Sequence, residues 1–214
     1  MSSTKPSQSI AGKPEKRVKR KHPEPDTATE ENEASPLREL IPDGDVILVV
    51  GPKKIKIQLS SHLLRSTSPV FAAMLGPNFK EGALLRESQG PVEIALPEDN
   101  ADAFWNLYSA LYGAHPRAHN LAPDDVYDIA FLADKYDLVE RLALAREAWF
   151  RGADTTYYIS TKATFKMLVA AYWLGSEFGF AYVSQTLVKD YHQPLYKYGM
   201  ETKDQILGLK LCCE

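Results

Sequence analysis

The strongest constraint on the fold is a pair of β-prone segments joined by a short turn, "DVILVV" at residues 45–50 and "KIKIQL" at residues 54–59. The first is a continuous apolar run rich in β-branched residues, which indicates a buried strand. The second alternates between an apolar side (Ile55, Ile57, Leu59) and a polar side (Lys54, Lys56, Gln58). Gly51 and Pro52 supply the turn. The segments therefore predict a hairpin with one face on the core and one toward solvent.

Two short helices are expected over "SSHLLRSTSPVFAAML", residues 60–75. Ser60 or Ser61 can cap the first helix, which carries His62. Ser68 can cap the second, and Pro69 then occupies a first helical position, where its missing N–H is not needed. Apolar residues recur at helical spacing along this second helix: Val70, Phe71, Met74 and Leu75. Gly76 and Pro77 end it.

A third strand is predicted at "PVEIALP", residues 91–97, because its apolar residues alternate. Helices follow at residues 98–113, 123–137 and 138–150. This order lacks the regular alternation of a doubly wound parallel fold. The predicted class is α+β, with a three-stranded sheet flanked by helical hairpins.

The two ends of the chain differ from this central part. Residues 1–40 are rich in Ser, Thr, Pro, Lys and Glu and nearly free of large apolar side chains, so we expect a disordered tail. Residues 151–214 predict a helical extension, in which apolar stripes over 161–175 and 177–194 form a helical hairpin on the main domain. The stripes are Phe165, Leu168, Val169 and Tyr172, and Phe180, Val183, Leu187 and Tyr191.

A compact basic cluster lies inside the tail. Its members are Lys16, Arg17, Lys19, Arg20 and Lys21. Such a cluster can act as a nuclear import signal, as a phosphate-binding arm or simply as a solvated charge run. A nuclear or cytoplasmic location, or both, is the corresponding expectation.

Composition and motifs exclude several functional classes. A formal net charge of −3 provides no global basic field, so we expect no direct nucleic-acid binding. The two cysteines, Cys212 and Cys213, are neighbours and give no disulfide framework or zinc site. No apolar run is long enough to span a bilayer, so no membrane association is expected.

Enzymatic chemistry also lacks support in the sequence. His62 lies near several serines, which invites a Ser/His interpretation, but no nucleophile elbow is present and the serines stand where helix caps are needed. No P-loop, dinucleotide fingerprint or metal-ligand spacing occurs. The prediction is a protein that is not an enzyme, with no catalytic residues, no metal and no cofactor.

Five sequence blocks follow one another within residues 43–150: "DVILVVG", "IQLSSHLLRSTSPVFAAML", "NFKEG", "VEIALPEDNADAFWNLYSALY" and "DIAFLADKYDLVERL". In this order they resemble a BTB/POZ domain of the kind found in filamentous fungi. The resemblance implies a protein-interaction fold that often self-associates. It also implies that Asp45 and His62 are structural core positions.

The same resemblance suggests a partner. BTB proteins that recruit the cullin-3 scaffold of ubiquitin ligases often carry a hydrophobic-x-Glu motif, which Phe79-Lys80-Glu81 matches. Phe79 would then supply an apolar anchor and Glu81 an orienting charge. The alternative is that Phe79 packs on its own helix and Glu81 is merely solvated.

The chain also departs from the family pattern. Leu63 stands where related zinc-finger repressors carry a basic residue, and the N-terminal segment used for swapped dimers is reduced to "SPLRELIP", residues 35–42. A homodimer is a possible form of the protein, but this short segment does not secure it. The runner-up function is a nuclear oligomerisation module linked to transcription regulation.

Overall fold

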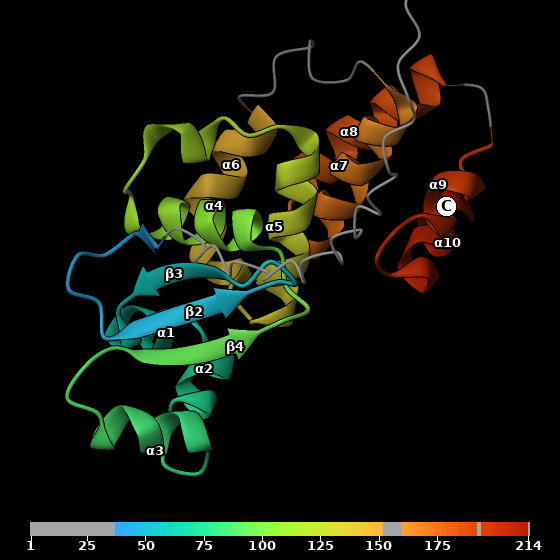
Figure 1. Ribbon diagram of the computed structural model, residues 1–214. Helices are drawn as coiled ribbons and strands as arrows, with labels where there is room; N and C mark the ends of the chain where they lie inside the picture. Colours follow the sequence, from blue (N-terminus) through green and yellow to red (C-terminus); the bar gives the residue numbers. More distant parts are fainter. Residues whose placement is uncertain (1–36, 152–159, 192–193, 214) are drawn as a thin grey trace, which may run out of the picture. The chain divides into compact units, whose positions relative to one another are not determined.

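The computed structural model describes residues 37–151, 160–191 and 194–213, and these residues form an α+β structure (Figure 1). Its sheet has four strands in the order β1-β3-β2-β4. Strand β2 (Val46–Val50) pairs antiparallel with β3 (Ile55–Leu59) and parallel with β4 (Val92–Leu96). The predicted α+β class is confirmed, whereas the predicted number of strands, three, is wrong.

The predicted hairpin is present as β2 and β3. Its turn begins at Gly51, whose φ of 73° lies in the left-handed region that glycine adopts without strain. The Lys54 N–H closes the turn by donating to the Gly51 carbonyl at 3.0 Å. Gln58, predicted on the solvent-facing side of the strand, is instead buried. Its Nε2 donates to the Gly44 carbonyl at 2.8 Å, which satisfies the buried amide. The hairpin thus buries a polar side chain only where a backbone acceptor meets it.

The fourth strand, β1 (Arg38–Glu39), lies in the part of the chain predicted to be a disordered tail. It pairs in parallel with β3, and the neighbouring Leu40 is only 6% exposed within the core. Residues 37–40 therefore belong to the folded body, and the predicted boundary at residue 40 is wrong for them. The reason is a long-range pairing with Ile57 and Gln58, which local composition does not report.

Three short helices connect β3 to β4. Helix α1 (Ser61–Thr67) is capped by Ser60, and α2 (Pro69–Met74) is capped by Ser68, as predicted. Ser68 also donates to the Tyr136 carbonyl at 2.6 Å, which ties the junction of α1 and α2 to the central helices. Helix α3 (Lys80–Glu87) was not predicted.

The central helices complete the core on one side of the sheet. They are α4 (Ala101–Tyr112), α5 (Pro123–Lys135) and α6 (Ala143–Arg151), with short 3₁₀ turns η1 (Pro116–His119) and η2 (Val139–Leu142). In β4 buried and exposed residues alternate strictly, so only one face of the strand meets the core. Figure 1 shows α4, α5 and α6 above the sheet. Gly113 ends α4 with a φ of 69°, as a C-terminal glycine does.

The C-terminal part is helical, as predicted. Helices α7 (Thr161–Trp173) and α8 (Glu177–Asp190) form the expected hairpin, and α7 packs on α5. Tyr172, predicted on the buried stripe of α7, is instead exposed. Two further helices, α9 (Tyr196–Met200) and α10 (Gln205–Cys213), lie within the predicted helical extension, but their bounds were not predicted. They cross where Gly199 faces the backbone of Gly208, so closely that neither position has room for a Cβ.

Across the three described stretches, no helix combines the length and the apolar character needed to cross a bilayer.

Candidate functional site

A groove of about 540 Å³ lies between α2 and the start of α3. Its lining is mostly apolar and includes one carboxylate; the residues are Pro69, Val70, Ala73, Met74, Phe79 and Glu81. The Phe79 side chain is 51% exposed, although phenylalanine is usually buried. The structure therefore brings Phe79 and Glu81, the two residues predicted for partner binding, into one concave site.

Helical periodicity in α2 explains how the groove arises. Phe71 and Leu75 point into the core, with 0% and 2% of their surfaces exposed. Val70 lies on the other side of the helix and is 36% exposed. Met74 is partly buried and lines the groove beside it. One apolar run thus supplies both a core face and a surface face.

The position of α3 is fixed by a close backbone approach. Gly82 is buried, and a Cβ placed on it would overlap the carbonyl oxygen of Gly76 and lie 2.7 Å from the Leu75 carbonyl carbon. Only glycine allows this approach. Because Phe79 and Glu81 stand at the start of α3, the approach also fixes the far wall of the groove.

The charged end of the groove belongs to Glu81. Its side chain is 19% exposed, and its Oε1 lies 3.7 Å from Nζ of the exposed Lys80. An ion pair with so exposed a lysine contributes little to stability, so a partner can displace the lysine and bind the carboxylate. An apolar anchor beside a partly buried carboxylate is suited to recognising a protein surface.

Asp45 anchors the start of α1 and is not a core residue. Its carboxylate accepts hydrogen bonds from the Ser61 N–H and from the Ser61 hydroxyl, each at 2.6 Å. Partial burial raises the pKa of Asp45, but the hydrogen bonds from the side chain and backbone of Ser61 outweigh it and hold the pKa below its usual value. The side chain remains exposed, so the prediction of a buried Asp45 is wrong.

His62 is also exposed, which contradicts its predicted place in the core. In α1 the core contact is made by Leu64, which is 0% exposed. A residue two positions earlier on a helix lies about 200° away around the axis and faces outward. Within the described residues the His62 imidazole makes no hydrogen bond, and no group of three or more His, Cys, Asp or Glu could hold a metal ion.

Replacing Asp45 with alanine is expected to lower the free energy of unfolding by about 1 kcal/mol at neutral pH, the usual cost of losing a helix cap. Because the folded-state pKa is lowered, this stabilisation is present above the unfolded pKa of about 3.8 and is lost as the pH falls through the folded pKa. Urea titrations at neutral and acidic pH would measure both effects. Ser61→Ala should add little in the Asp45→Ala background; fully additive effects would contradict the assignment.

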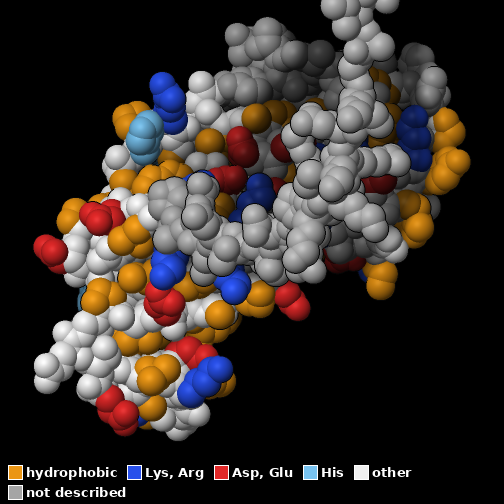
Figure 2. Space-filling model, viewed as in Figure 1, with side chains coloured by type: hydrophobic (Ala, Val, Ile, Leu, Met, Phe, Trp, Pro, Cys, Tyr) orange, Lys and Arg blue, Asp and Glu red, His pale blue; other side chains and the backbone are white. Residues whose placement is uncertain are grey.

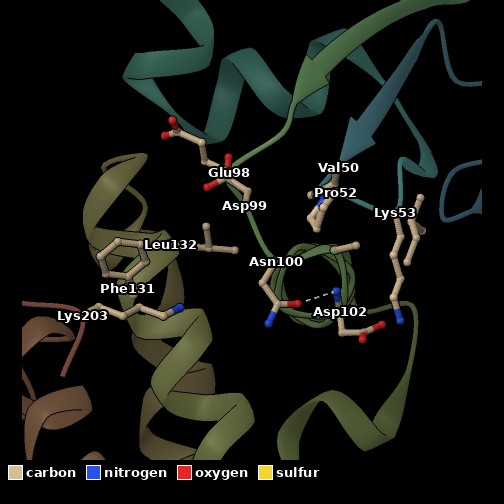
Figure 3. A pocket seen from close by; sticks show the side chains of 13 residues that line it. Val50, Pro52, Lys53, Glu98, Asp99, Asn100, Asp102, Phe131, Leu132 and Lys203 are labelled. Atoms are coloured by element: carbon tan, nitrogen blue, oxygen red, sulfur yellow. Dashed lines mark hydrogen bonds between the residues drawn. The ribbon is translucent and has the colours of Figure 1, made fainter. Parts of the chain in front are cut away.

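A second cavity, of about 360 Å³, lies where the β2–β3 turn meets α4 and α5 (Figure 3). Its buried carboxylate, Asp99, accepts hydrogen bonds from Lys135 Nζ and the Tyr136 hydroxyl, both at 2.7 Å. Lys203 lies against the Phe131 ring, with Nζ 4.6 Å from the ring centroid, and pairs with Asp128 at 2.9 Å. Burial, followed by the hydrogen bond to Asp99, raises the pKa of Tyr136. These internal pairs make the cavity a junction that ties the C-terminal segment to α5.

Sequence reasoning found part of the groove and missed the rest. Val70 and Met74 were predicted only as members of an apolar helical run, and nothing in that run marks them as surface residues. The one sequence signal for the groove is Ala73, whose small, exposed side chain leaves space between its larger neighbours. The basic cluster of Lys16, Arg17, Lys19, Arg20 and Lys21 lies outside the described residues, and its role in nuclear import stays a prediction.

Comparison with models of known protein families and with curated proteins gives no match to this chain.

Proposed function

We propose that this protein is a non-enzymatic interaction module of the BTB/POZ type that binds a protein partner through the groove between α2 and α3. The observation that supports it is the half-exposed Phe79 in a groove where, among the described residues, Glu81 supplies the one carboxylate. Exposing an aromatic ring to water costs free energy, and a partner that covers it recovers that cost. Such a ring, surrounded by aliphatic side chains, has the character of a binding hot spot.

The proposed partner is cullin-3, with this chain as a substrate adaptor of the ubiquitin ligase. The support is twofold: Phe79-Lys80-Glu81 resembles the motif of such adaptors, and the structure lines the groove with Phe79 and Glu81. A helical hairpin, α7 and α8, follows the central helices, as in many adaptors of this kind.

A binding assay with the cullin-3 N-terminal domain tests this proposal. Phe79→Ala should weaken binding about thirtyfold, which corresponds to about 2 kcal/mol for a hot-spot residue. Glu81→Ala should weaken it less, because its carboxylate orients the partner more than it anchors it. Leu84→Ala is the matched control, since Leu84 on α3 is equally exposed, at 50%, but does not line the groove.

Two outcomes would count against the proposal. If the unmodified chain does not bind cullin-3, the named partner is wrong. If it binds and Leu84→Ala weakens binding as much as Phe79→Ala does, the groove is not the contact surface.

A further inference from the structure

Lys203 lies between α9 and α10, and its ammonium group enters a site on α5 that consists of Tyr127, Asp128 and Phe131. Its Nζ is 4.6 Å from the centroid of the Phe131 ring, 5.8 Å from that of the Tyr127 ring and 2.9 Å from Oδ1 of Asp128. An ammonium group is attracted to an aromatic face within about 6 Å and forms strong hydrogen bonds with a carboxylate. We call these three residues of α5 the ammonium site.

The walls of the ammonium site are held by residues other than Lys203. Both of its rings contact Trp173 of α7, with ring centroids 5.4 and 5.6 Å apart. Asn100, at the start of α4, donates from Nδ2 to Oδ2 of Asp128 at 2.7 Å, which leaves Oδ1 for the ammonium group. In Figure 3, Lys203 extends past Phe131 toward Asn100. The site therefore has supports on α4 and α7 that do not require Lys203.

Lys203 fastens the α9–α10 segment to α5. Besides its side-chain contacts, its N–H donates to the Tyr127 hydroxyl at 2.7 Å. Glu201 of the same segment pairs with Lys162 of α7 at 2.6 Å, but both side chains are more than half exposed. An ion pair so exposed contributes little to stability. Release of the Lys203 side chain would therefore remove much of the polar attachment of this segment.

Apolar burial holds the segment only in part. Leu207 and Leu211 of α10 are buried, whereas Ile206 and Leu209 are 72% and 38% exposed. Figure 2 shows hydrophobic side chains at the right-hand edge of the molecule, over α9 and α10. A helix with apolar residues all round is normally buried on all sides. Because α10 leaves part of its apolar surface in water, its docking is weaker than that of a fully covered helix.

We propose that the ammonium site binds a lysine side chain of a partner protein, and that Lys203 of this chain competes with that lysine for the site. The cavity of about 360 Å³ described above opens beside Lys203 and Phe131, so a side chain can reach the site from there. Among the described residues its lining has three carboxylates and two lysines: Glu98, Asp99, Asp102, Lys53 and Lys203. When Lys203 withdraws, the negative charge is in larger excess, which favours a cation.

Asp128 defines the form of lysine that the site accepts. The 2.9 Å contact with its Oδ1 needs an N–H donor, which an unmodified lysine has and a trimethylated lysine lacks. The apolar stem of a lysine without the ammonium group would have neither this bond nor the attraction to the rings. The ligand class is therefore an unmodified lysine in a peptide segment.

NMR spectroscopy of the full chain tests the proposal with Nα-acetyl-lysine methylamide as the probe. The corresponding norleucine compound, which has the stem but no ammonium group, is the control. In Lys203→Ala the site is empty, so the lysine probe should shift the Asn100 side-chain amide signals with a Kd of about 1–10 mM. The unmodified chain should bind the probe at least about tenfold more weakly, because Lys203 must leave first. Binding there should also make the α10 amides exchange faster.

Two variants in the Lys203→Ala background test the walls of the site. Phe131→Leu removes the aromatic face, and Asp128→Asn removes the charge but keeps an acceptor for Asn100. Each should weaken binding of the probe about fivefold or more. Glu98→Gln is the control, because Glu98 lines the cavity but is not part of the ammonium site. Well-dispersed amide spectra would check that each variant folds.

Three outcomes would overturn the proposal. The first is that Lys203→Ala shows no shift with the lysine probe, or equal shifts with the norleucine compound. The second is that neither wall variant weakens binding more than Glu98→Gln does. The third is that the unmodified chain binds the probe as tightly as Lys203→Ala, since Lys203 would then not compete. The groove between α2 and α3 is unchanged in all these variants, so the result does not depend on cullin-3 binding.

Discussion

Replacing Phe71 with alanine is expected to lower the free energy of unfolding by about 3–5 kcal/mol, the usual cost of truncating a buried phenylalanine. Its ring is stacked on Tyr136, with ring centroids 4.8 Å apart and planes 7° apart, and meets Phe104 edge-on at 6.3 Å. Tyr136 is held at its far end by its hydrogen bond to Asp99. These partners cannot move freely to fill the space, so most of the cavity would remain.

Urea unfolding followed by circular dichroism would measure this loss. Val70→Ala is the matched control, because Val70 neighbours Phe71 on α2 but is 36% exposed and lines the groove. Its effect on stability should stay within about 0.5 kcal/mol. A Phe71→Ala variant as stable as Val70→Ala would mean that the aromatic cluster of Phe71, Phe104 and Tyr136 is not a rigid core.

Replacing Gly82 with alanine is expected to abolish partner binding while the core stays folded. The new methyl group would overlap the Gly76 carbonyl, and because this neighbour is backbone rather than a flexible side chain, α3 itself must move. Phe79 and Glu81 would move with it, and the groove would lose one wall. The loss of binding should be at least as large as that of Phe79→Ala.

Hydrogen exchange gives a measurement for Gly82→Ala that does not depend on knowing the partner. The amides of α3 should exchange faster, while those of α4 and α5 should change little. Gly90→Ala is the control, because a Cβ at Gly90, in the loop after α3, meets nothing within 4 Å. Unchanged exchange in α3, with binding retained, would show that the approach of Gly82 to Gly76 does not position the groove.

The elements that sequence patterns predicted well are those with clear local signals. Alternation predicted β3 and β4, serine caps predicted α1 and α2, and Gly113 predicted the end of α4. Each of these signals acts within a few residues of the element it specifies. The α+β class followed from their order along the chain.

The missed elements depend on tertiary contacts. Helix α3 has no side-chain cap at Phe79 and contains Gly82, a poor helix former. Helices α9 and α10 were predicted only as part of a helical extension, without bounds, because each contains a glycine, Gly199 or Gly208, that allows the two helices to cross closely. Strand β1 has two residues and pairs with a strand distant in sequence. None of these features leaves a local pattern.

For the candidate site, the resemblance contributed more than periodicity did. Phe79 and Glu81 were assigned from a motif, and the structure places both in the groove. Val70 and Met74 were not assigned, because a helical run does not say which of its apolar residues the rest of the fold will cover. His62 was predicted in the core from the motif alone, and it is exposed. Its position two residues before the buried Leu64 places it on the opposite side of α1, which a sequence motif does not specify.

The order of strands in the sheet also has a consequence for how the chain folds. The β2–β3 pair is local, so it can form early at little entropic cost of loop closure. Strand β4 is separated from β2 in the sequence by α1, α2 and α3, so its pairing closes a longer loop and is expected later. Until β4 arrives, the edge of β2 is open to the corresponding strand of another molecule. Newly made chains held at high concentration are therefore expected to exchange β4 between molecules, and slow release of the nascent chain should reduce that exchange.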